Sequence, residues 1–520
     1  MKKILAGTIA AVMTLGLFAG CGKSKEPAGD AAKTTELGVF SWQLAGLNTN
    51  PDTPIARRLE EKLGVKIKPI ASDSNTWEEK LNALLASGST PDIFLNYGPV
   101  DRNVQFNRWI KDGIVLNLDE YVKDGKYPNL EKALSRFEWM KDMQLGNNYC
   151  IPVATYFEDK DAVVNSAYLI RQDWLSNVGM KAPESTDELY EVLRAFTFND
   201  PDKNGENDTY GLTSNGGVHR FNLIYNAFGA SLNRFSKDSG KWMPEVVSDN
   251  MKEAVRFLRK LYTEKILDPD FVVNTEQQVT EKFVSGKVGL IFSSAGINWY
   301  NGYYGKFSKT YPDKEASELI DYMPVMNGVD GKRVDGVSNF WLVSSLNAQM
   351  EESKKEKALE LIDYLMSDEG LELVRWGVEG EEFKKENGVN VSIVPADANG
   401  AEQTLRKYDA AADLRGLFTG DAGFENRAEN AKNQEAFNGI AKYMECAVGD
   451  PLRGVIIDEN EFKQSKVSEL SQLAVEKITK MILESDDIDS DFAAFVSQWN
   501  EMGGLEYIEK MNDAAKACGK

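Results

Sequence analysis

The feature that most constrains the fold is an alternation of short apolar runs with amphipathic segments of helical period. Residues 37–42, 65–70 and 93–95 are predicted as strands, and residues 77–85 carry apolar side chains at helical spacing. Strands that alternate with helices in this way form a largely parallel sheet with helices on its faces.

The alternation returns later in the chain. Helices are predicted over residues 189–196, 254–261 and 358–365, and strands over residues 288–292 and 340–343. Ser185 and Glu188 have the spacing of a capping box at the start of the first of these helices. One sheet would not organise this many elements around a single core, so the sequence predicts two α/β lobes.

The N-terminus has the pattern of a secretory signal. Lys2 and Lys3 precede an apolar run over residues 4–18, which is shorter than the ~20 residues that a membrane-spanning helix needs. The run ends in LFAG before Cys21, which resembles the lipobox of bacterial lipoproteins, although Phe18 stands where that motif prefers Leu. An ordinary secretory signal with a chance cysteine is the alternative.

The resemblance implies a lipoprotein signal peptide over residues 1–20 and a lipid of the palmitate type on Cys21. Residues 21–35 contain no large apolar side chain, so we expect them to form a flexible tether. The mature chain is then expected on the outer face of the cell membrane, held there by acyl chains.

Composition excludes several classes of function. The formal net charge is −21, so nucleic acid and anionic lipid are not expected as partners, and a strongly anionic ligand would need a local basic pocket. The chain has one histidine, His219, which excludes a zinc site built on several histidines, and we interpret it as structural or peripheral. Cys150, Cys446 and Cys518 are odd in number and form no CxxC pair, so no disulfide framework is indicated.

An acidic loop over residues 200–211 has the spacing of an EF-hand calcium loop. Oxygen-bearing side chains stand at positions 1, 3, 5 and 9, a glycine stands at position 6, and the carbonyl of the residue at position 7 supplies a further ligand. The predicted ligands of a structural calcium ion are Asp200, Asp202, Asn204, Glu206 and Asp208. Gly211 stands where such loops carry a bidentate glutamate. The alternative is a solvated turn without metal.

Six short motifs then occur in the order in which they occur in one family. They are residues 87–93 (SGSTPDI), 149–152 (YCIP), 169–175 (LIRQDWL), 200–211, 283–289 (FVSGKVG) and 375–380 (RWGVEG). Cys150 departs from the family pattern, which has glycine there. The chain resembles the extracellular solute-binding proteins of ABC importers, in the lipoprotein branch that binds sugars and oligosaccharides.

The resemblance implies a two-lobed α/β fold of the type II periplasmic-binding-protein kind, with hinge strands and a ligand cleft between the lobes. The expected partition is residues 36–155 with 325–376 in the first lobe, and residues 156–324 with 377–520 in the second. The chain is expected to leave the first lobe near residues 152–161, to return near 324–337, and to cross again near 376–380. The implied partners are a carbohydrate and the membrane permease subunits, with the protein a monomer and not an enzyme.

A sugar site needs aromatic faces for stacking and nearby polar groups for the hydroxyls. Such side chains line a cleft when they lie at strand ends and loops. The candidates are Trp42, Asn96, Tyr97, Tyr156, Trp299, Tyr300, Asn339, Phe340, Trp341, Trp376 and Glu379.

Two other functions stay open from the sequence. A receptor for a peptide would also have an aromatic cleft. A secreted glycoside hydrolase would need two carboxylates about 5–10 Å apart, and 81 acidic residues always offer such a pair.

Overall fold

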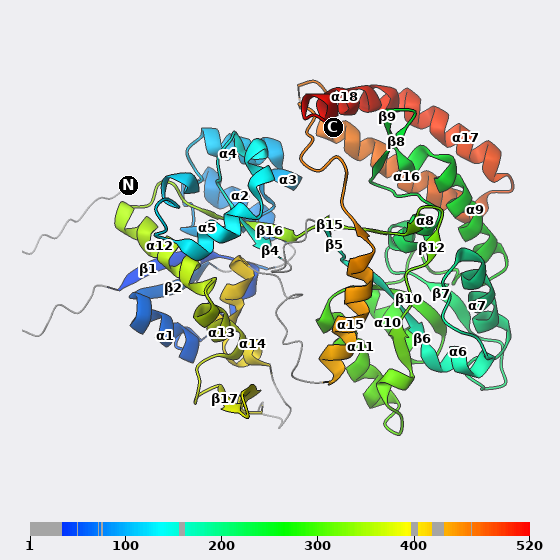
Figure 1. Cartoon of the computed structure of the whole chain (residues 1–520), viewed down its shortest axis with the longest axis horizontal. Coiled ribbons are helices and arrows are strands. Elements are labelled where there is room, and N and C mark those ends of the chain that lie inside the picture. The colour runs from blue at the N-terminus through cyan, green and yellow to red at the C-terminus, as the bar shows by residue number, and fades with distance from the viewer. Residues whose placement is uncertain are drawn as a thin grey trace, which may run out of the picture.

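The buried apolar side chains of this chain form two large cores, each around its own sheet. The computed structural model describes residues 34–48, 50–70, 72–73, 76–154, 162–396, 404–418, 431–458 and 460–520. Figure 1 shows the two lobes side by side. The two-lobed α/β fold predicted from the sequence is therefore confirmed. The predicted signal peptide, Cys21 and the tether up to residue 33 lie outside the described residues.

The first lobe contains a five-stranded sheet in the order β2-β1-β3-β16-β4. Its strands are β1 (Thr35–Phe40), β2 (Val65–Ile70), β3 (Ile93–Asn96), β4 (Ile151–Ala154) and β16 (Phe340–Leu346). The first three are parallel, as the alternation predicts, whereas β16 returns from far along the chain and runs antiparallel to β3 and β4. β1 ends at Phe40, two residues earlier than predicted, because Trp42 begins a 3-10 helix, η1 (Trp42–Asn48).

Helices pack on this sheet and bury their apolar stripes in the first core. They are α1 (Pro54–Leu63), α2 (Trp77–Ala86), α3 (Gly98–Asp101), α4 (Asn103–Lys111), α5 (Pro128–Ser135), α12 (Glu352–Leu365), α13 (Asp368–Trp376) and α14 (Leu405–Tyr408), with the 3-10 helices η2 (Leu118–Glu120), η3 (Glu138–Gln144) and η7 (Ala410–Leu417). The ends of α1 show how the sequence sets such boundaries. The Thr53 hydroxyl accepts a hydrogen bond from the N–H of Ala56, and Gly64 ends the helix at φ 63°.

The second lobe contains a four-stranded sheet in the order β11-β6-β10-β7. Its strands are β6 (Ser166–Arg171), β7 (Tyr210–Thr213), β10 (Val288–Ser294) and β11 (Ile320–Tyr322). The helices around it are α6 (Gln172–Val178), α7 (Thr186–Phe198), α8 (Asn222–Ala227), α9 (Asp249–Thr263), α10 (Glu276–Val284) and α11 (Ile297–Thr310), with η4 (Gly217–Phe221), η5 (Glu245–Val247) and η6 (Ala316–Glu318). Ser185 caps α7 as predicted, but the Glu188 carboxylate accepts from the N–H of Glu184, so the capping box is only half formed.

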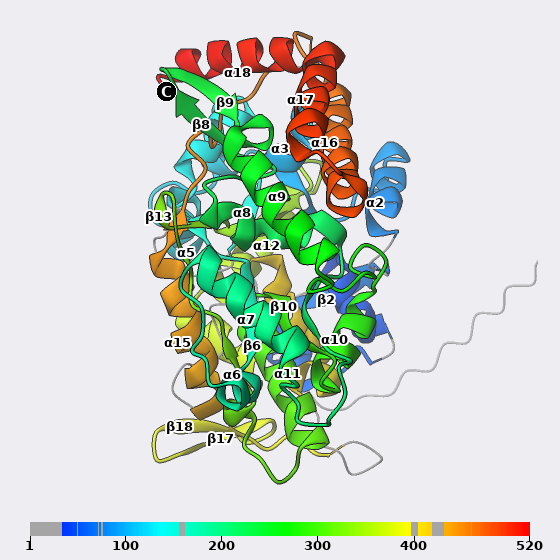
Figure 2. The same ribbon diagram turned by 90° about the vertical axis from the view of Figure 1, so that its right-hand side faces the viewer.

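The C-terminal helices pack on the second lobe (Figure 2). They are α15 (Ala431–Glu445), α16 (Gln464–Glu484), α17 (Ile488–Trp499) and α18 (Leu505–Ala517), with the π-helical turn η8 (Asn500–Gly504) between the last two. Arg259 of α9 donates to the carbonyls of Ile482, Leu483 and Ser485, which satisfies acceptors at the C-terminal end of α16. Along the part of the chain that the structure describes, no helix combines the length and the apolar composition that crossing a membrane requires.

Short strands complete the fold. Antiparallel pairs join β8 (Phe235–Asp238) to β9 (Lys241–Pro244), β12 (Asn327–Gly328) to β13 (Gly331–Lys332) and β17 (Phe383–Glu386) to β18 (Val389–Ser392), while β14 (Val334–Asp335) runs parallel to β19 (Ala447–Val448). Between the lobes, β5 (Ala162–Val163) pairs with β15 (Val337–Ser338) in antiparallel fashion. These two strands lie on the outgoing and returning crossings that the sequence predicts near residues 152–161 and 324–337.

The later segments divide differently from the expected partition. Val325 and Val334 still belong to the second core, and Phe340 is the first returning residue in the first core. A crossing near residues 376–380 is not seen, because Val374, Val378 and the apolar residues of the 411–418 segment contribute to the first core. The chain next contributes to the second core at Ala436. The crossing lies later in the chain because Val374 at the end of α13 and Val378 after its cap both pack into the first core.

A buried carboxyl pair holds the late part of the first lobe to its beginning. Glu382 and Asp409 are both fully buried. Asp409 accepts hydrogen bonds from the N–H groups of Ile55 and Ala411, both at 2.8 Å, and Glu382 accepts one from the N–H of Val378 at 2.9 Å. Burial, together with the nearby Asp409 carboxylate, raises the pKa of Glu382 to about 7.

The pair makes the stability of the first lobe depend on pH. Because the folded-state pKa of Glu382 is raised, its contribution is fully present below about 4.5 and is lost as pH rises through about 7. Between pH 6 and 8.5, the free energy of unfolding of the wild type should fall by about 1 kcal/mol more than that of Glu382→Gln. Chemical unfolding at both pH values measures this.

Glu379 offers a matched control, because it is exposed beside Lys385 and Glu379→Gln should keep the wild-type pH dependence. Equal pH dependence in the wild type and in Glu382→Gln would show that Glu382 is ionised throughout this range.

Candidate functional site

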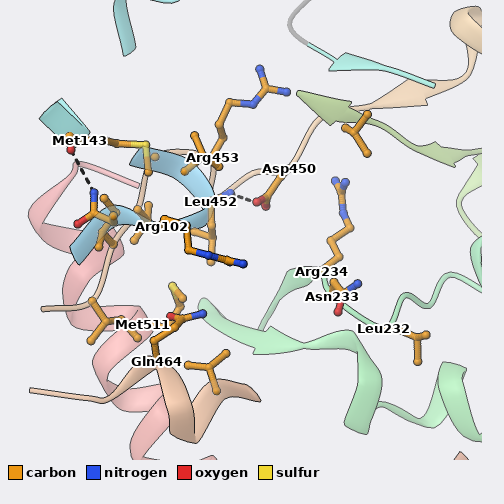
Figure 3. A pocket seen from close by; sticks show the side chains of 18 of the residues that line it. Arg102, Met143, Leu232, Asn233, Arg234, Asp450, Leu452, Arg453, Gln464 and Met511 are labelled. Carbon is orange, nitrogen blue, oxygen red and sulfur yellow. Dashed lines mark hydrogen bonds between the residues drawn. The ribbon is translucent and has the colours of Figure 1, made fainter. Parts of the chain in front are cut away.

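A large cavity lies between the two lobes. Its volume is about 1490 Å³, and its lining comes from both lobes and from the segment before α16. Figure 3 shows Arg102, Arg234 and Arg453 around this space. The crossing strand region at Asp335–Val337 also lines it, so the cavity lies where the two lobes are joined.

Each wall is positioned by side chains that are fixed in a core. On the first lobe, Phe106 of α4 is fully buried, while Asn107, Arg108 and Lys111 of the same helix line the cavity. On the second lobe, Val218 and Phe221 of η4 are buried. The intervening His219 and Arg220 line the cavity. In both elements the apolar residues are anchored and the polar ones are presented to the cleft.

The arginines of the cavity are held in different ways. Arg102 pairs with Glu78 at 2.9 Å, and its guanidinium lies 4.6 Å from the centre of the Tyr97 ring. Arg234 lies 3.6 Å from Glu245 and 3.7 Å from Asp335. The Arg220 guanidinium lies 4.3 Å from the centre of the Phe292 ring. These contacts fix the direction of each guanidinium before a ligand arrives.

His219 lies beside these cations. Burial, and to a lesser extent the charge of Arg220, lowers the pKa of His219. It therefore lines the cavity as a neutral group at pH 7. His219 is exposed at the wall of the cavity, and its interpretation as structural or peripheral stays a prediction.

Three of the predicted aromatic residues come together on the first lobe. The ring centres of Trp42 and Trp341 are 5.8 Å apart in an edge-on pair, and Trp77 joins Trp42 to Tyr97 at 4.9 and 5.0 Å. Trp341 is 40% exposed, whereas Trp77 is 6% exposed. Trp77 was not predicted, because its place in a helical stripe has the pattern of a core residue.

Trp299 lies on the second lobe and is 42% exposed. It lines a smaller cavity of about 80 Å³ together with Arg220, Phe292, Ser294 and Tyr303. Because Arg220 and Phe292 also line the large cavity, the two spaces are neighbours.

Four predicted polar or aromatic residues are interior. Asn96, Tyr300, Asn339 and Phe340 are each less than a tenth exposed. Asn96 donates to the Ser345 hydroxyl and accepts from the N–H of Gly98. Tyr300 stacks on Tyr322 at 5.0 Å, and Phe340 packs edge-on against Phe137 at 5.7 Å. Each of these contacts lies within a single lobe, so it stabilises that lobe and does not face the cleft.

None of the described candidates lines the large cavity, Trp42, Tyr97 and Trp341 included, and Trp299 lines only its smaller neighbour. The Trp376 ring packs 6.2 Å from Phe383 in the first lobe, and exposed Glu379 lies 3.9 Å from Lys385. Tyr156 falls in residues 155–161, which are outside the described residues.

Sequence reasoning did not identify the cationic and amide residues of the cleft. They are Arg102, Arg220, Arg234, Arg453, Asn165, Asn222 and Gln464. The signal nearest to them was the GGVHR segment after the Tyr210–Leu212 run, since loops that follow strands present their side chains at the sheet edge.

The acidic loop is folded around its own polar atoms. Asp200 accepts from the N–H groups of Asn204 and Gly205, and Gly205 has φ 82°. The Asn204 amide donates to Asp202 at 2.9 Å and to Asp208 at 3.3 Å, so these side chains converge. Lys287 pairs with Asp208 and lowers the pKa of that carboxyl. Glu206 donates its N–H to Asn204.

Two details of the loop bear on metal binding. The Oδ1 atom of Asp202 is buried without a hydrogen-bond partner, and burial raises the pKa of this carboxyl. A side chain at Gly211 would place its Cβ 2.6 Å from the carbonyl oxygen of Leu193, so packing forbids the missing glutamate. Within the residues described, no group of three or more His, Cys, Asp or Glu side chains is placed to hold a metal ion.

The cysteines do not contribute to the cleft. Cys150, Cys446 and Cys518 are free thiols. Burial raises the pKa of Cys150, which is fixed in the first core as a small apolar residue.

Comparison with known proteins agrees with this architecture. The sequence model of the family described as bacterial extracellular solute-binding protein matches residues 48–372. The chain is 25% identical over 521 residues to the lipoprotein LipO of Bacillus subtilis, covering 98% of this chain and 97% of LipO. It is 24% identical over 533 residues to the polygalacturonan/rhamnogalacturonan-binding protein YtcQ of the same organism, covering 96% of each.

A solved structure shows the same fold. It is an EF-hand mutant of the ABC-transporter substrate-binding protein FusA of S. pneumoniae in complex with fructo-nystose. Its TM-score to this chain is 0.64 at 21% identity, over 93% of this chain and 100% of FusA.

The exposures of Trp341 and Trp77 predict different costs of truncation. Trp341→Ala should lower the free energy of unfolding by about 1 kcal/mol, the value of one exposed aromatic pair. Trp77→Ala should cost about 3–5 kcal/mol, because it empties a core position. Urea unfolding followed by circular dichroism measures both, and equal costs would place Trp341 in the core.

Proposed function

The chain belongs to the bacterial extracellular solute-binding protein family, and on that premise we propose that it captures an oligosaccharide between its lobes and delivers it to an ABC permease. The observation that carries the proposal is the interlobe cavity of about 1490 Å³. Pockets for small ligands are commonly about 300–1,000 Å³, so this space suits a chain of several sugar units.

The lining has the chemistry that sugar hydroxyls need. Amide side chains come from every wall, and they are Asn103, Gln105, Asn107, Asn165, Asn222, Asn233, Asn460 and Gln464. The Oδ1 atom of Asn222 is buried and has no hydrogen-bond partner within the described structure. A buried acceptor without a partner is costly, and a ligand hydroxyl would satisfy it.

Aromatic side chains are exposed on both lobes, Trp341 by 40% on the first and Trp299 by 42% on the second. We propose that Trp42, Tyr97 and Trp341 of the first lobe and Trp299 of the second stack on sugar rings when the lobes close. The other candidates of the sequence analysis do not enter this proposal. YtcQ is named for binding polygalacturonan and rhamnogalacturonan, and FusA was solved with fructo-nystose, which supports a carbohydrate ligand.

The sequence left two alternatives open, a glycoside hydrolase and a peptide receptor. The family consists of binding proteins, so a glycoside hydrolase is set aside. The amides that line the cavity could also form hydrogen bonds with the backbone of a peptide. The binding experiment below therefore compares peptides with oligosaccharides.

We further propose that the protein is a monomer anchored outside the cell by a lipid on Cys21. The support is the LFAG sequence before Cys21 and the similarity to a protein named lipoprotein LipO. A tethered receptor of this kind stays close to its permease, which raises the effective concentration of captured ligand there.

A thermal-shift panel of oligosaccharides and peptides tests the ligand class. At 100 times its Kd, a true ligand stabilises the folded protein by about 2.7 kcal/mol. An oligosaccharide should raise the melting temperature, and Trp299→Ala should weaken its binding about tenfold. Phe198→Ala is the matched control, because Phe198 is 43% exposed and lies outside the cavity lining. A shift with peptides alone would overturn the proposal.

We also propose a structural calcium ion in the loop over residues 200–208. Asp200, Asp202, Asn204 and Asp208 would hold it with the carbonyl of Glu206, and the buried Oδ1 of Asp202 fits such a role. The ion would supply positive charge at a place where Lys287 pairs with Asp208 and the Asn204 amide donates to Asp202.

Chelation tests the ion directly. EDTA should lower the melting temperature of the wild type, and Asp202→Asn should lower it with no further drop in EDTA. Asp238→Asn, in an exposed strand outside the loop, should respond to EDTA as the wild type does. If EDTA leaves the wild type unchanged, the loop functions without metal.

A further inference from the structure

The cleft has a charge opposite to that of the chain. The formal net charge of the protein is −21, yet six cationic side chains and three carboxylates line the cavity. The cations are Arg102, Arg108, Lys111, Arg220, Arg234 and Arg453, and the carboxylates are Asp335, Asp450 and Asp458. An acidic protein that concentrates cations in one recess creates a local attraction for anions.

Part of this positive charge is already neutralised by the protein. Arg234 shares Asp335 and Glu245, and Arg102 pairs with Glu78. These two arginines therefore need no ligand to balance their charge. The cations available to pair with a ligand are those that form no ion pair with a carboxylate of the protein.

Arg220 of the second lobe is such a cation. Its guanidinium packs on the Phe292 ring at 4.3 Å, and no carboxylate of the described residues forms an ion pair with it. Glu276 lines the same small cavity without pairing with it. The side chain is half-buried, and a partly desolvated cation is stabilised by an anion that reaches it. The planar guanidinium fits a carboxylate in a bidentate arrangement.

Lys111 and Arg108 face the same cavity from the first lobe. Lys111 forms no ion pair with any described residue, and the partner of Arg108, Asp112, lies 3.5 Å away in an exposed pair. The two lobes thus each present a cation to one space. An anionic ligand between them would satisfy both sides and draw the lobes together, whereas a neutral ligand would leave like charges to approach each other.

We propose that the ligand is an acidic oligosaccharide whose carboxylates pair with Arg220 on the second lobe and with Lys111 or Arg108 on the first. The proposal rests on the proposed function and specifies its substrate class. The amides of the cavity serve the hydroxyls, and the unpaired cations serve the carboxylates of uronate units.

Isothermal titration calorimetry with trigalacturonate and its fully methyl-esterified form tests the proposal, because the two have the same sugar skeleton and differ in charge. Trigalacturonate should bind at least about tenfold more tightly than the ester, and the difference should shrink as salt is added. Arg220→Gln should remove most of the difference, since Gln keeps a hydrogen-bonding side chain without the charge.

Lys480→Gln is the matched control. Lys480 is an exposed lysine on α16, 13 residues beyond Val467 and so about 20 Å from the cavity along the helix. Lys480→Gln removes one positive charge, as Arg220→Gln does, and this variant should keep the preference for trigalacturonate. Circular dichroism of each variant confirms that it is folded.

The outcomes separate this proposal from the proposed function. Equal or tighter binding of the ester, or of neutral kestose, would overturn the acidic ligand and leave an oligosaccharide receptor. Binding of triaspartate as tight as that of trigalacturonate would overturn it as well, since the cleft would then recognise charge alone. If none of the sugars binds, the proposed function fails and this inference fails with it.

Discussion

The separation of the apolar residues into two cores is the constraint on which the rest of this structure depends. Each core closes around its own sheet, and no described residue belongs to both cores. Packed cores resist deformation, so relative motion is concentrated in the crossings. The pair β5 and β15 lies there, with Asp335–Val337 in the cavity lining. A ligand that touches both lobes can therefore change their relative position without unfolding either.

A buried ionic network links the crossing to the cleft. Arg333 is 8% exposed and pairs with Glu245 at 2.6 Å and with Asp335 at 2.9 Å. The same two carboxylates hold Arg234 at the cavity wall, while Asn226 donates to Asp335. Burial raises the pKa of Glu245, although Arg333 opposes the shift. Breaking such a network by removing one partner is costly, so it fixes the crossing relative to the second lobe.

Local patterns predicted the elements well and the site unevenly. The strands at residues 65–70 and 93–95 and the helix at residues 77–85 follow from apolar period, which is a local property. Trp42, Tyr97 and Trp341 do lie together, as the prediction that strand ends meet at one sheet edge implies, but their role in binding stays a prediction. Asn96 and Phe340 occupy equally favourable positions in sequence but are buried, since the face on which a side chain lies depends on partners far along the chain. Arg220 was missed because an unpaired cation becomes visible only when its surroundings are known.

The central claim is that an oligosaccharide is enclosed between the two lobes and draws them together. Small-angle X-ray scattering of the protein with and without a saturating oligosaccharide from the binding panel tests it most directly. The account predicts that the radius of gyration falls on binding, because the cavity between the lobes contracts around the ligand. Saturating binding with an unchanged radius of gyration would contradict enclosure and would place the ligand on one lobe alone.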